Sequence, residues 1–354
     1  MMNSLLIQFI LLLSIFIYII SSEFPILVWY QRKWHKEESC QYLQCYTTFD
    51  RKKLINSSAV IINEYHVKSD GDKISFQFPD KTINPKALYI YSLFESSVRS
   101  FKRKEYNKVK LPRNYFNAIY SYINTSDIVH RFSGPWIFIP SIKQEITSEI
   151  KSRIKNSVLK DKKHSITWIV SHCRTVSGRE KSIKQLERYI DIKQYGKCSD
   201  NKIRKDEKII KKLFQKSYFF IASENTDCYG YITEKYWDRY YYNSIPIVNI
   251  RSIYQNTLPP HSFIAMDDFK NSKDMVKFLK YLIKNKDKYI EYFYYKYQGW
   301  YNTRHNEFCS LCHELILFKK NNISRTYEDT REWIRRNDKC YTNDYVYKLW
   351  NHLL

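Results

Sequence analysis

Short apolar runs alternate with longer polar stretches along most of the chain. Six runs are apolar, short and rich in β-branched or aromatic residues: 26–30, 59–63, 87–92, 166–171, 218–222 and 245–248. Runs without apolar–polar alternation are typical of strands buried on both faces of a parallel sheet. Helical stretches follow the fourth and fifth runs, which predicts an α/β protein that contains strand–helix–strand units.

One such unit, residues 217–248, carries a concentration of polar side chains just after its first strand. A polar turn over 223–231 follows the strand, and Thr233 is placed to cap a helix that continues with Glu234 and Lys235. Ligands of open α/β sheets bind outside the carboxyl ends of the strands. Free N–H groups at a helix start suit a phosphate, and the Glu234 carboxylate can accept hydrogen bonds from sugar hydroxyls. The unit is therefore expected to bind a sugar nucleotide.

The N-terminal run over residues 5–20 is almost entirely apolar. A membrane span needs about 20 apolar residues, so this run is short but usable in a thin bilayer. No basic residue precedes it, while Arg32 and Lys33 follow it, which is unlike the charge distribution of a segment with a cytoplasmic N-terminus. Both a membrane anchor and a cleavable signal peptide fit the run.

The chain is strongly basic, with 59 Lys and Arg residues against 36 Asp and Glu residues, a net charge of +23. This excess of positive charge favours a negatively charged partner, and the candidates are a nucleic acid, an acidic membrane surface and a diphosphate substrate. The lysines are scattered along the whole chain, and no zinc-finger or RNA-recognition pattern accompanies them. We therefore expect no nucleic-acid partner.

The cysteines and glycosylation sequons indicate the secretory pathway. The chain has 8 cysteines, an even number that is compatible with four disulfides. Asn56, Asn124 and Asn322 each begin an N-glycosylation sequon. Together with the apolar N-terminus, these features are typical of a protein that folds in an oxidising compartment.

Residues 224–235 read E-N-x-x-x-x-x-Y-x-T-E-K and are followed by I-P-I-V at 245–248. This sequence resembles the donor-binding motif of the α1,3/4-fucosyltransferases, glycosyltransferase family 10, in an invertebrate-like form. Six positions are in register with the motif: Glu224, Asn225, Tyr231, Thr233, Glu234 and Lys235. The resemblance covers residues 26 to 315 or so. It implies the GT-B fold, in which two Rossmann-like domains face each other, preceded here by the N-terminal hydrophobic segment.

The resemblance also implies a domain organisation. Its parts are a signal-anchor or transmembrane segment over 1–25, an acceptor-side domain over 26–162, a GDP-fucose-binding domain over 163–300 and a C-terminal tail over 301–354 that is disulfide-linked to the first domain. It favours an anchor over a cleaved signal, and hence a single-pass type II protein of the Golgi membrane with a lumenal catalytic domain. Secretion after signal cleavage is the alternative.

The implied reaction is the transfer of fucose, with inversion, from GDP-β-L-fucose to a hydroxyl of N-acetylglucosamine, expected to be O3. The acceptor would be a glycoprotein glycan of the N-glycan, LacNAc or LacdiNAc type. Glu95 follows the strand predicted at 87–92, in a segment that resembles the family's E-S-P sequence. The glutamate of that sequence is expected to take the acceptor proton as general base.

The same resemblance implies how the donor is bound. Arg179 matches the arginine of the family's V-S-N-x…R segment, and with Lys235 it would stabilise the leaving diphosphate. Asn225, Tyr231 and Glu234 would position the phosphate, the ribose or the fucose.

No metal or other cofactor is required on this scheme, because fixed cations neutralise the diphosphate, although a divalent metal could stimulate the reaction. The D-G-D triplet at 70–72 resembles the metal-binding D-x-D of other glycosyltransferases, but it has the composition of an ordinary turn. The C-x-x-C motif at 309–312 has no second pair that would complete a zinc site.

The family's C-x-x-C motif is bonded back to the first domain, and Cys173 and Cys198 leave the ends of strands that would be neighbours in a parallel sheet. Four pairs are therefore expected: Cys40–Cys309 and Cys45–Cys312 from the resemblance, Cys173–Cys198 from the strand ends, and Cys228–Cys340 by elimination.

The chain departs from the family pattern in three segments. Ser97 replaces the proline of E-S-P, and Ile123 and Asn124 replace two arginines. Arg251 lies in a turn where the family has glycines. These departures leave two alternatives, an inactive relative that binds GDP or a glycan, and a GT-B transferase that uses another sugar nucleotide.

Overall fold

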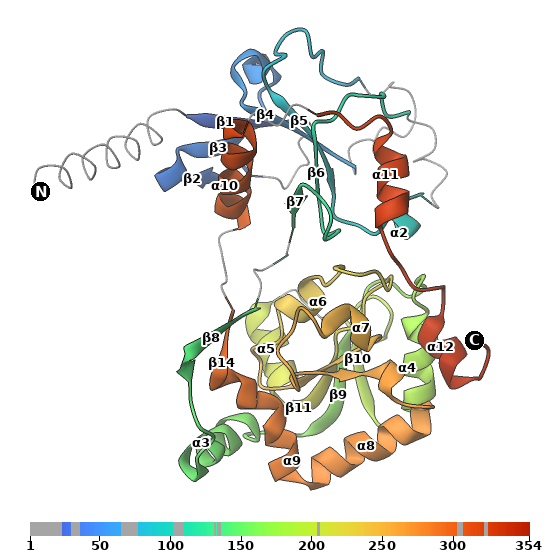
Figure 1. The fold of residues 1–354 in the computed structure, drawn as a ribbon. Coiled ribbons are helices and arrows are strands. Elements are labelled where there is room, and N and C mark those ends of the chain that lie inside the picture. The colour runs from blue at the N-terminus through green and yellow to red at the C-terminus, as the bar shows by residue number, and fades with distance from the viewer. Residues whose placement is uncertain are drawn as a thin grey trace, which may run out of the picture. The chain divides into compact units, whose positions relative to one another are not determined.

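In the computed structural model the chain forms two compact units (Figure 1). Unit 1 contains the chain before Arg131 and residues 305–337, and unit 2 contains residues 131–304 and 338–354. The structure describes residues 23–29, 36–64, 77–101, 110–130, 132, 136–203, 206–302, 307–321 and 325–354. Within these ranges no helix is both long and apolar enough to cross a membrane. The apolar run at 5–20, the D-G-D triplet at 70–72 and the sequon at Asn322 lie outside them.

Unit 1 is built on a seven-stranded sheet with the order β2-β3-β1-β4-β5-β6-β7. Its strands are β1 (Phe24–Val28), β2 (Ser39–Cys40), β3 (Cys45–Thr48), β4 (Ala59–Asn63), β5 (Leu88–Leu93), β6 (Ala118–Ser121) and β7 (Ile128–Val129). All neighbours are parallel except β2 and β3. The carboxyl ends of β4, β5 and β6 therefore lie along one edge of the sheet.

Helix α10 (Glu307–Lys320) covers part of this sheet, although it follows β7 by more than 170 residues of sequence (Figure 1). Its Leu311 and Leu315 join one apolar cluster with Ile61 and Ile90 of the central strands, which explains why the chain returns to unit 1. The remaining helices of the unit are short: η1 (Gln41–Leu43), η2 (Arg51–Asn56), α2 (Ser97–Phe101) and α11 (Thr330–Asn337).

Unit 2 is built on a five-stranded, all-parallel sheet with the order β10-β9-β11-β12-β13. Its strands are β9 (His164–Ile169), β10 (Ile192–Tyr195), β11 (Ser217–Ile221), β12 (Ile245–Val248) and β13 (Ile264–Ala265). A separate antiparallel ribbon joins β8 (Trp136–Lys143) to β14 (Gln298–Asn302). Strands β9, β11 and β12 correspond to the apolar runs of the sequence, within two residues at each end.

The helices of unit 2 surround this sheet (Figure 1). They are α3 (Ser148–Val158), α4 (Arg179–Glu187), α5 (Glu207–Gln215), α6 (Glu234–Trp237), α7 (Arg251–Tyr254), η5 (Met266–Asp268), α8 (Ser272–Lys284), α9 (Lys286–Ile290), η6 (Glu291–Lys296) and α12 (Tyr345–Trp350). Helix α8 shows why they form where they do. The Asn271 side chain caps its first turn, and Met275, Leu279 and Leu282 recur at helical spacing and are buried in the core.

The boundaries of the units differ from those expected at 162/163 and at 300/301. The chain enters unit 2 at Arg131, because Trp136 packs edge-to-face on Tyr240 and Tyr295 and α3 buries its apolar face in the same core. The expected C-terminal tail is divided between the units: α10 and α11 belong to unit 1, whereas α12 belongs to unit 2.

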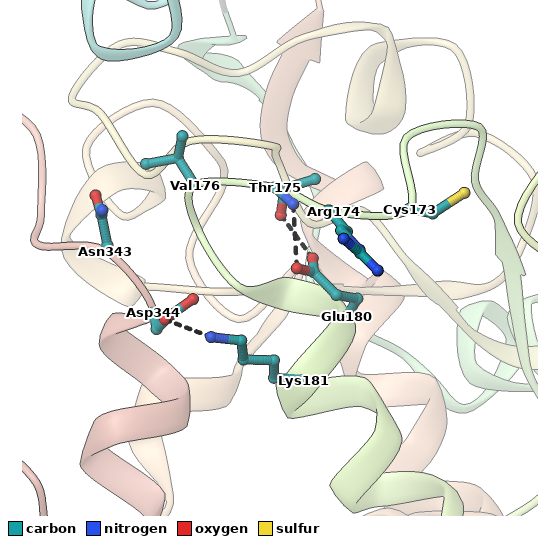
Figure 2. A pocket seen from close by; sticks show the side chains of 8 residues that line it. All are labelled: Cys173, Arg174, Thr175, Val176, Glu180, Lys181, Asn343 and Asp344. Carbon is teal, nitrogen blue, oxygen red and sulfur yellow. Dashed lines mark hydrogen bonds and ion pairs between the residues drawn. The ribbon is translucent and has the colours of Figure 1, made fainter. Parts of the chain in front are cut away.

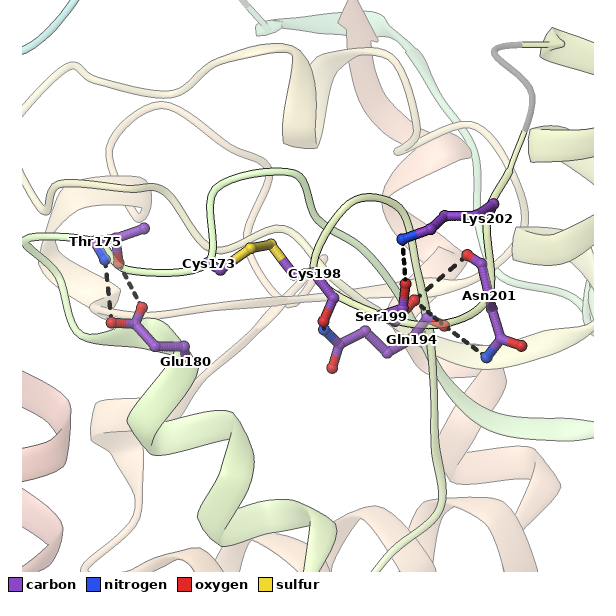
Figure 3. Close-up of a disulfide and its surroundings, with 8 residues drawn as sticks. All are labelled: Cys173, Thr175, Glu180, Gln194, Cys198, Ser199, Asn201 and Lys202. Atoms are coloured by element: carbon purple, nitrogen blue, oxygen red, sulfur yellow. Dashed lines mark hydrogen bonds between the residues drawn. A yellow bond between two sulfur atoms is a disulfide. The ribbon is translucent and has the colours of Figure 1, made fainter.

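All eight cysteines form disulfides, in the four pairs expected: Cys40–Cys309, Cys45–Cys312, Cys173–Cys198 and Cys228–Cys340. The first two fasten α10 to the β2–β3 edge of unit 1. The third joins the segments that follow β9 and β10 (Figure 3). There the Gln194 carbonyl accepts hydrogen bonds from Ser199 and Asn201, which holds the loop against the strand.

The two disulfides of α10 close nearly the same loop, with sequence separations of 269 and 267 residues. We expect that replacing either pair by alanines lowers the free energy of unfolding by roughly 2–3 kcal/mol, because the remaining bond still closes the long loop. Replacing both pairs should cost more than the sum of the two single losses. Chemical denaturation of the three variants measures this difference, and strictly additive losses would contradict the shared-loop explanation.

Candidate functional site

The candidate site of unit 2 lies where β9, β11 and β12 end. Two loops carry most of the residues that the sequence identifies: 170–178, which leads into α4, and 222–233, which leads into α6. Ser177 ties the loops together, because its N–H donates to the Asn225 carbonyl at 3.0 Å and its hydroxyl donates to the Glu224 carbonyl at 2.7 Å. The two loops therefore form one structural element at the carboxyl edge of the sheet.

Glu224 is the centre of a buried hydrogen-bond cluster. The backbone N–H and the hydroxyl of Thr233 both donate to its carboxylate at 2.8 Å, and Lys235 Nζ lies 2.7 Å from Glu224 Oε2. Burial raises the pKa of Glu224, and the Lys235 charge opposes that shift. The carboxylate is too buried to meet a ligand, so its role is to hold Thr233 and Lys235 in place.

The Thr233 side chain does not form the helix cap that the sequence predicts. Thr233 is the N-cap residue of α6, but its side chain makes no capping bond to the helix and donates to Glu224 instead. Helix α6 is a single turn of 4 residues, so the dipole at its start is smaller than that of a longer helix.

Lys235 and Glu234 are the accessible members of the motif. The Lys235 side chain is 17% exposed and lies between Glu224 and Glu234, whose Oε1 is 3.2 Å from Nζ. The Glu234 side chain is 57% exposed. The ammonium group also donates to the Thr233 hydroxyl at 2.7 Å, so three neighbouring acceptors fix its position, and the exposed Glu234 carboxylate beside it is available to hydroxyl groups.

Arg179 is brought to the same loops. It is the first residue of α4, directly after Gly178, which has a left-handed φ of 62°. Its guanidinium is buried and donates to the Ser223 carbonyl. Burial lowers the pKa of Arg179, while Glu224 opposes that shift, and an arginine remains charged under these conditions. Asn225 and Tyr231 are buried in the same region.

A second buried network was not identified from the sequence. Ser223 donates to the Asn249 side-chain oxygen, and Asn249 Nδ2 donates to Asp227 Oδ1 at 2.8 Å. Burial raises the pKa of Asp227 to about 8, and the bond from Asn249 opposes the shift. Asp227 and Asn249 are 22 residues apart, and only their positions at two neighbouring strand ends could have indicated the contact.

Asp227 gives a testable dependence of stability on pH. An unfolded aspartate releases its proton near pH 3.8, whereas Asp227 in the folded chain retains it up to about pH 8. Its contribution to folding is therefore present at low pH and is lost as the pH rises from about 4 to 8, by about 1.4 kcal/mol per unit of pKa shift. In thermal melts, the melting temperature of Asp227→Asn relative to the wild type should therefore rise as the pH rises over this range, because only the wild type loses this contribution. A constant difference in melting temperature would contradict this.

Arg251 lies in the turn where the family has glycines, and the carboxylates of Asp267 and Asp268 hold it in place. Its guanidinium forms a two-point ion pair with Asp268, and the backbone N–H of Arg251 donates to Asp267 Oδ1 at 2.8 Å. The guanidinium also lies over the Phe263 ring at 4.8 Å. The side chain therefore has its own binding partners and does not need a ligand for its charge.

In unit 1, Glu95 lies just beyond the carboxyl end of β5. Its carboxylate forms an ion pair with Arg99 of α2, at 2.8 Å, and the residue is 9% exposed. The neighbouring Phe94 ring packs on His130, and burial lowers the pKa of His130 to about 4, so that imidazole is neutral at physiological pH. Glu95 is thus an oriented carboxylate at the edge where the strands of unit 1 end.

A hollow of about 550 Å³ opens beside the start of α4 (Figure 2). It is lined by Cys173, Arg174, Thr175, Val176, Glu180, Lys181, Asn343 and Asp344. Glu180 accepts hydrogen bonds from the N–H and hydroxyl of Thr175 at 3.1 and 2.8 Å, which closes the turn before the helix.

The described residues contain one cluster with the spacing of a metal site, Cys228, Asp338 and Cys340. Both of its cysteines are joined to each other in a disulfide, so they offer no thiolate to an ion. Of the three expected sequons, those at Asn56 and Asn124 lie within the described residues, and both asparagines are exposed.

Comparisons with known proteins show the family to which the chain belongs. Residues 159–333 match the model "Glycosyltransferase family 10 (fucosyltransferase) C-term", and residues 21–133 match "Fucosyltransferase, N-terminal". The α-(1,3)-fucosyltransferase fut-1 of Caenorhabditis elegans is 40% identical over 143 residues, 40% of this chain and 33% of that protein. The α-(1,3)-fucosyltransferase C of Drosophila melanogaster is 24% identical over 260 residues, 71% of this chain and 60% of that protein.

These curated relatives are longer than the matched part, and the chain spans between a third and three fifths of their length. Among solved structures, that of an α1,3-fucosyltransferase with GDP superposes with a TM-score of 0.54 and 15% identity, covering 87% of this chain and 94% of that one. At this identity the likeness shows the fold. The two family models together match most of both units, and the chain therefore belongs to the fucosyltransferases of glycosyltransferase family 10.

Proposed function

We propose that this protein is an inverting α1,3-fucosyltransferase that moves fucose from GDP-β-L-fucose to O3 of N-acetylglucosamine in a glycoprotein glycan. The observation that carries the proposal is the cluster of Glu224, Thr233 and Lys235, which presents one fixed ammonium group at the carboxyl edge of a parallel sheet. Family membership and the GDP complex of the similar fold support the nucleotide part of the donor.

The proposed roles are supported by where each residue lies in its own unit. Lys235 and Arg179 stabilise the leaving diphosphate, because both are cations held at the ends of neighbouring strands. Glu234 is exposed and takes a ribose or sugar hydroxyl, while Asn225 and Tyr231 shape the wall of the site. On this scheme the protein's own cations neutralise the diphosphate.

Glu95 of unit 1 takes the proton from the acceptor hydroxyl as that oxygen attacks the anomeric carbon and GDP leaves. A carboxylate at the end of a strand, oriented by Arg99, suits this role. The assignment of each unit to one substrate, unit 1 to the glycan and unit 2 to GDP-fucose, corresponds to the GT-B arrangement and is part of the proposal.

We also propose that the enzyme works in the lumen of the secretory pathway, as a type II Golgi protein anchored by residues 1–25. The four disulfides support an oxidising compartment, because such bonds are rare in the cytosol. The exposed asparagines of the sequons at Asn56 and Asn124 are consistent with it.

The test is the release of GDP by residues 24–354, incubated with GDP-fucose and a panel of N-glycan, LacNAc and LacdiNAc acceptors. We expect release that depends on the acceptor and a product that carries fucose on O3 of N-acetylglucosamine. GDP-mannose and UDP-galactose serve as donor controls. Binding of GDP without turnover on any acceptor would favour an inactive relative, and turnover with a control donor would indicate a different transferase.

A further inference from the structure

A segment near the C-terminus contacts the loops of the candidate donor site. Residues 338–344, here called the strap, follow the family-model match, which ends at 333. The strap leads into α12, whose Trp350 Nε1 donates to the Met266 and Phe269 carbonyls at 3.2 and 3.1 Å. The far end of the strap is thereby anchored in unit 2.

The strap supplies a backbone partner for the 223–231 turn. Tyr341 N–H donates to the Asp227 carbonyl at 2.8 Å, and Tyr229 N–H donates to the Lys339 carbonyl at 2.9 Å. The Cys228–Cys340 disulfide lies between these two bonds and makes the connection covalent. The turn that carries Glu224 and Tyr231 is therefore held by a strand-like segment from more than 100 residues further along the chain.

The strap also contacts the loop that leads to Arg179. Asp344 N–H donates to the Val176 carbonyl at 3.2 Å, and Lys181 Nζ donates to Asp344 Oδ2 at 2.6 Å (Figure 2). A Cβ added to Gly178 would lie 2.1 Å from Asp344 Oδ1. Gly178 immediately precedes Arg179, so Asp344 packs directly on the turn that orients that arginine.

A third contact reaches the segment after β12. The Tyr341 hydroxyl lies 2.6 Å from Ser252 Oγ and 3.2 Å from the Tyr229 hydroxyl. The strap thus touches the segments that follow three neighbouring strands, β9, β11 and β12. Besides the Cys340 disulfide, the strap side chains that make these contacts are those of Tyr341 and Asp344.

We propose that the strap positions the donor site, with Tyr341 and Asp344 as its positioning residues. This inference rests on the proposed function, because the loops that it holds are those assigned to GDP-fucose. Loops fixed before binding lose less conformational entropy when the ligand arrives, so the strap should increase donor affinity without contacting the reacting atoms. Its effect should appear in the binding of the donor and of GDP, and it should leave binding of the acceptor unchanged.

The test compares Tyr341→Phe, Asp344→Asn and the double variant with the wild type. Phenylalanine keeps the ring and removes only the hydroxyl, and asparagine tolerates the left-handed φ of 58° at position 344 while removing the charge. We expect the double variant to raise KM for GDP-fucose about tenfold, since small misplacements at a site are amplified in this way. KM for the acceptor should be unchanged, and calorimetry should show a matching loss of affinity for GDP.

Glu332→Gln is the matched control. Glu332 forms an ion pair with Arg336 at 2.8 Å within α11 of unit 1, six residues before the strap. It should behave as the wild type does. An unchanged KM for the donor in the double variant, or equal changes for donor and acceptor, would overturn the positioning role. Failure of the wild type itself to bind GDP would instead remove the proposed function, and the inference with it.

Discussion

Replacing Lys235 by alanine is expected to lower kcat/KM for GDP-fucose by about a thousandfold. Lys235 is the accessible cation of the site, held 2.7 Å from Glu224 and 3.2 Å from Glu234. Removing a fixed charge that stabilises a leaving group typically costs two to three orders of magnitude. Steady-state kinetics with GDP-fucose, together with calorimetry of GDP binding, measures the effect.

The same substitution should also reduce stability, because it removes the ion-pair partner of the buried Glu224 carboxylate. Breaking a buried pair on one side costs roughly 3–5 kcal/mol. Lys235→Ala combined with Glu224→Gln should recover part of the stability but none of the activity, which separates the two roles of the lysine. Lys288→Ala, in an exposed pair with Glu291, is the control and should change neither property. Wild-type turnover by a folded Lys235→Ala enzyme would refute the assignment of the diphosphate site.

The sequence predicts the central strands because their pattern is local. The runs at 59–63 and 245–248 correspond to β4 and β12 without a shift, and the others correspond to within two residues. The two-residue strands β2, β7 and β13 could not be predicted, because a pattern of period two cannot be recognised over two positions. Their strand geometry comes from pairing with neighbours that are distant in sequence.

The candidate site was predictable where a linear motif carries it. Glu224, Thr233 and Lys235 lie within 12 residues, and the structure joins them in one hydrogen-bond cluster. The Asp227–Asn249 contact and the strap were missed, because their partners are separated by 22 to more than 100 residues and no residue type marks them. The division of the C-terminal tail between the units was missed for the same reason. The expected Cys40–Cys309 and Cys45–Cys312 disulfides place α10 in unit 1, but they do not indicate that α12 belongs to unit 2.

Replacing Glu95 by glutamine is expected to lower kcat by roughly 10²–10⁴-fold while leaving the affinity for GDP unchanged. Glutamine has nearly the same shape and can still accept a hydrogen bond from Arg99, which lies 2.8 Å from Glu95 Oε2, but its amide cannot take a proton from the acceptor. Because GDP is assigned to unit 2, a base in unit 1 should affect turnover and not the binding of GDP. Single-turnover kinetics with a glycan acceptor and calorimetry with GDP measure the two properties separately.

Two further variants make the assignment of the base specific. Glu314→Gln removes an exposed glutamate from α10 of the same unit and should leave the rate unchanged. Arg99→Ala removes the group that orients Glu95, so it should lower kcat by less than Glu95→Gln does, because the base remains present but is less well fixed. If Glu95→Gln retained more than a tenth of the wild-type rate with unchanged melting temperature, the acceptor proton would have to go to another group of unit 1. In that case the carboxyl edge of β4 to β7, where Glu64 and His130 also lie, would be the place to search for it.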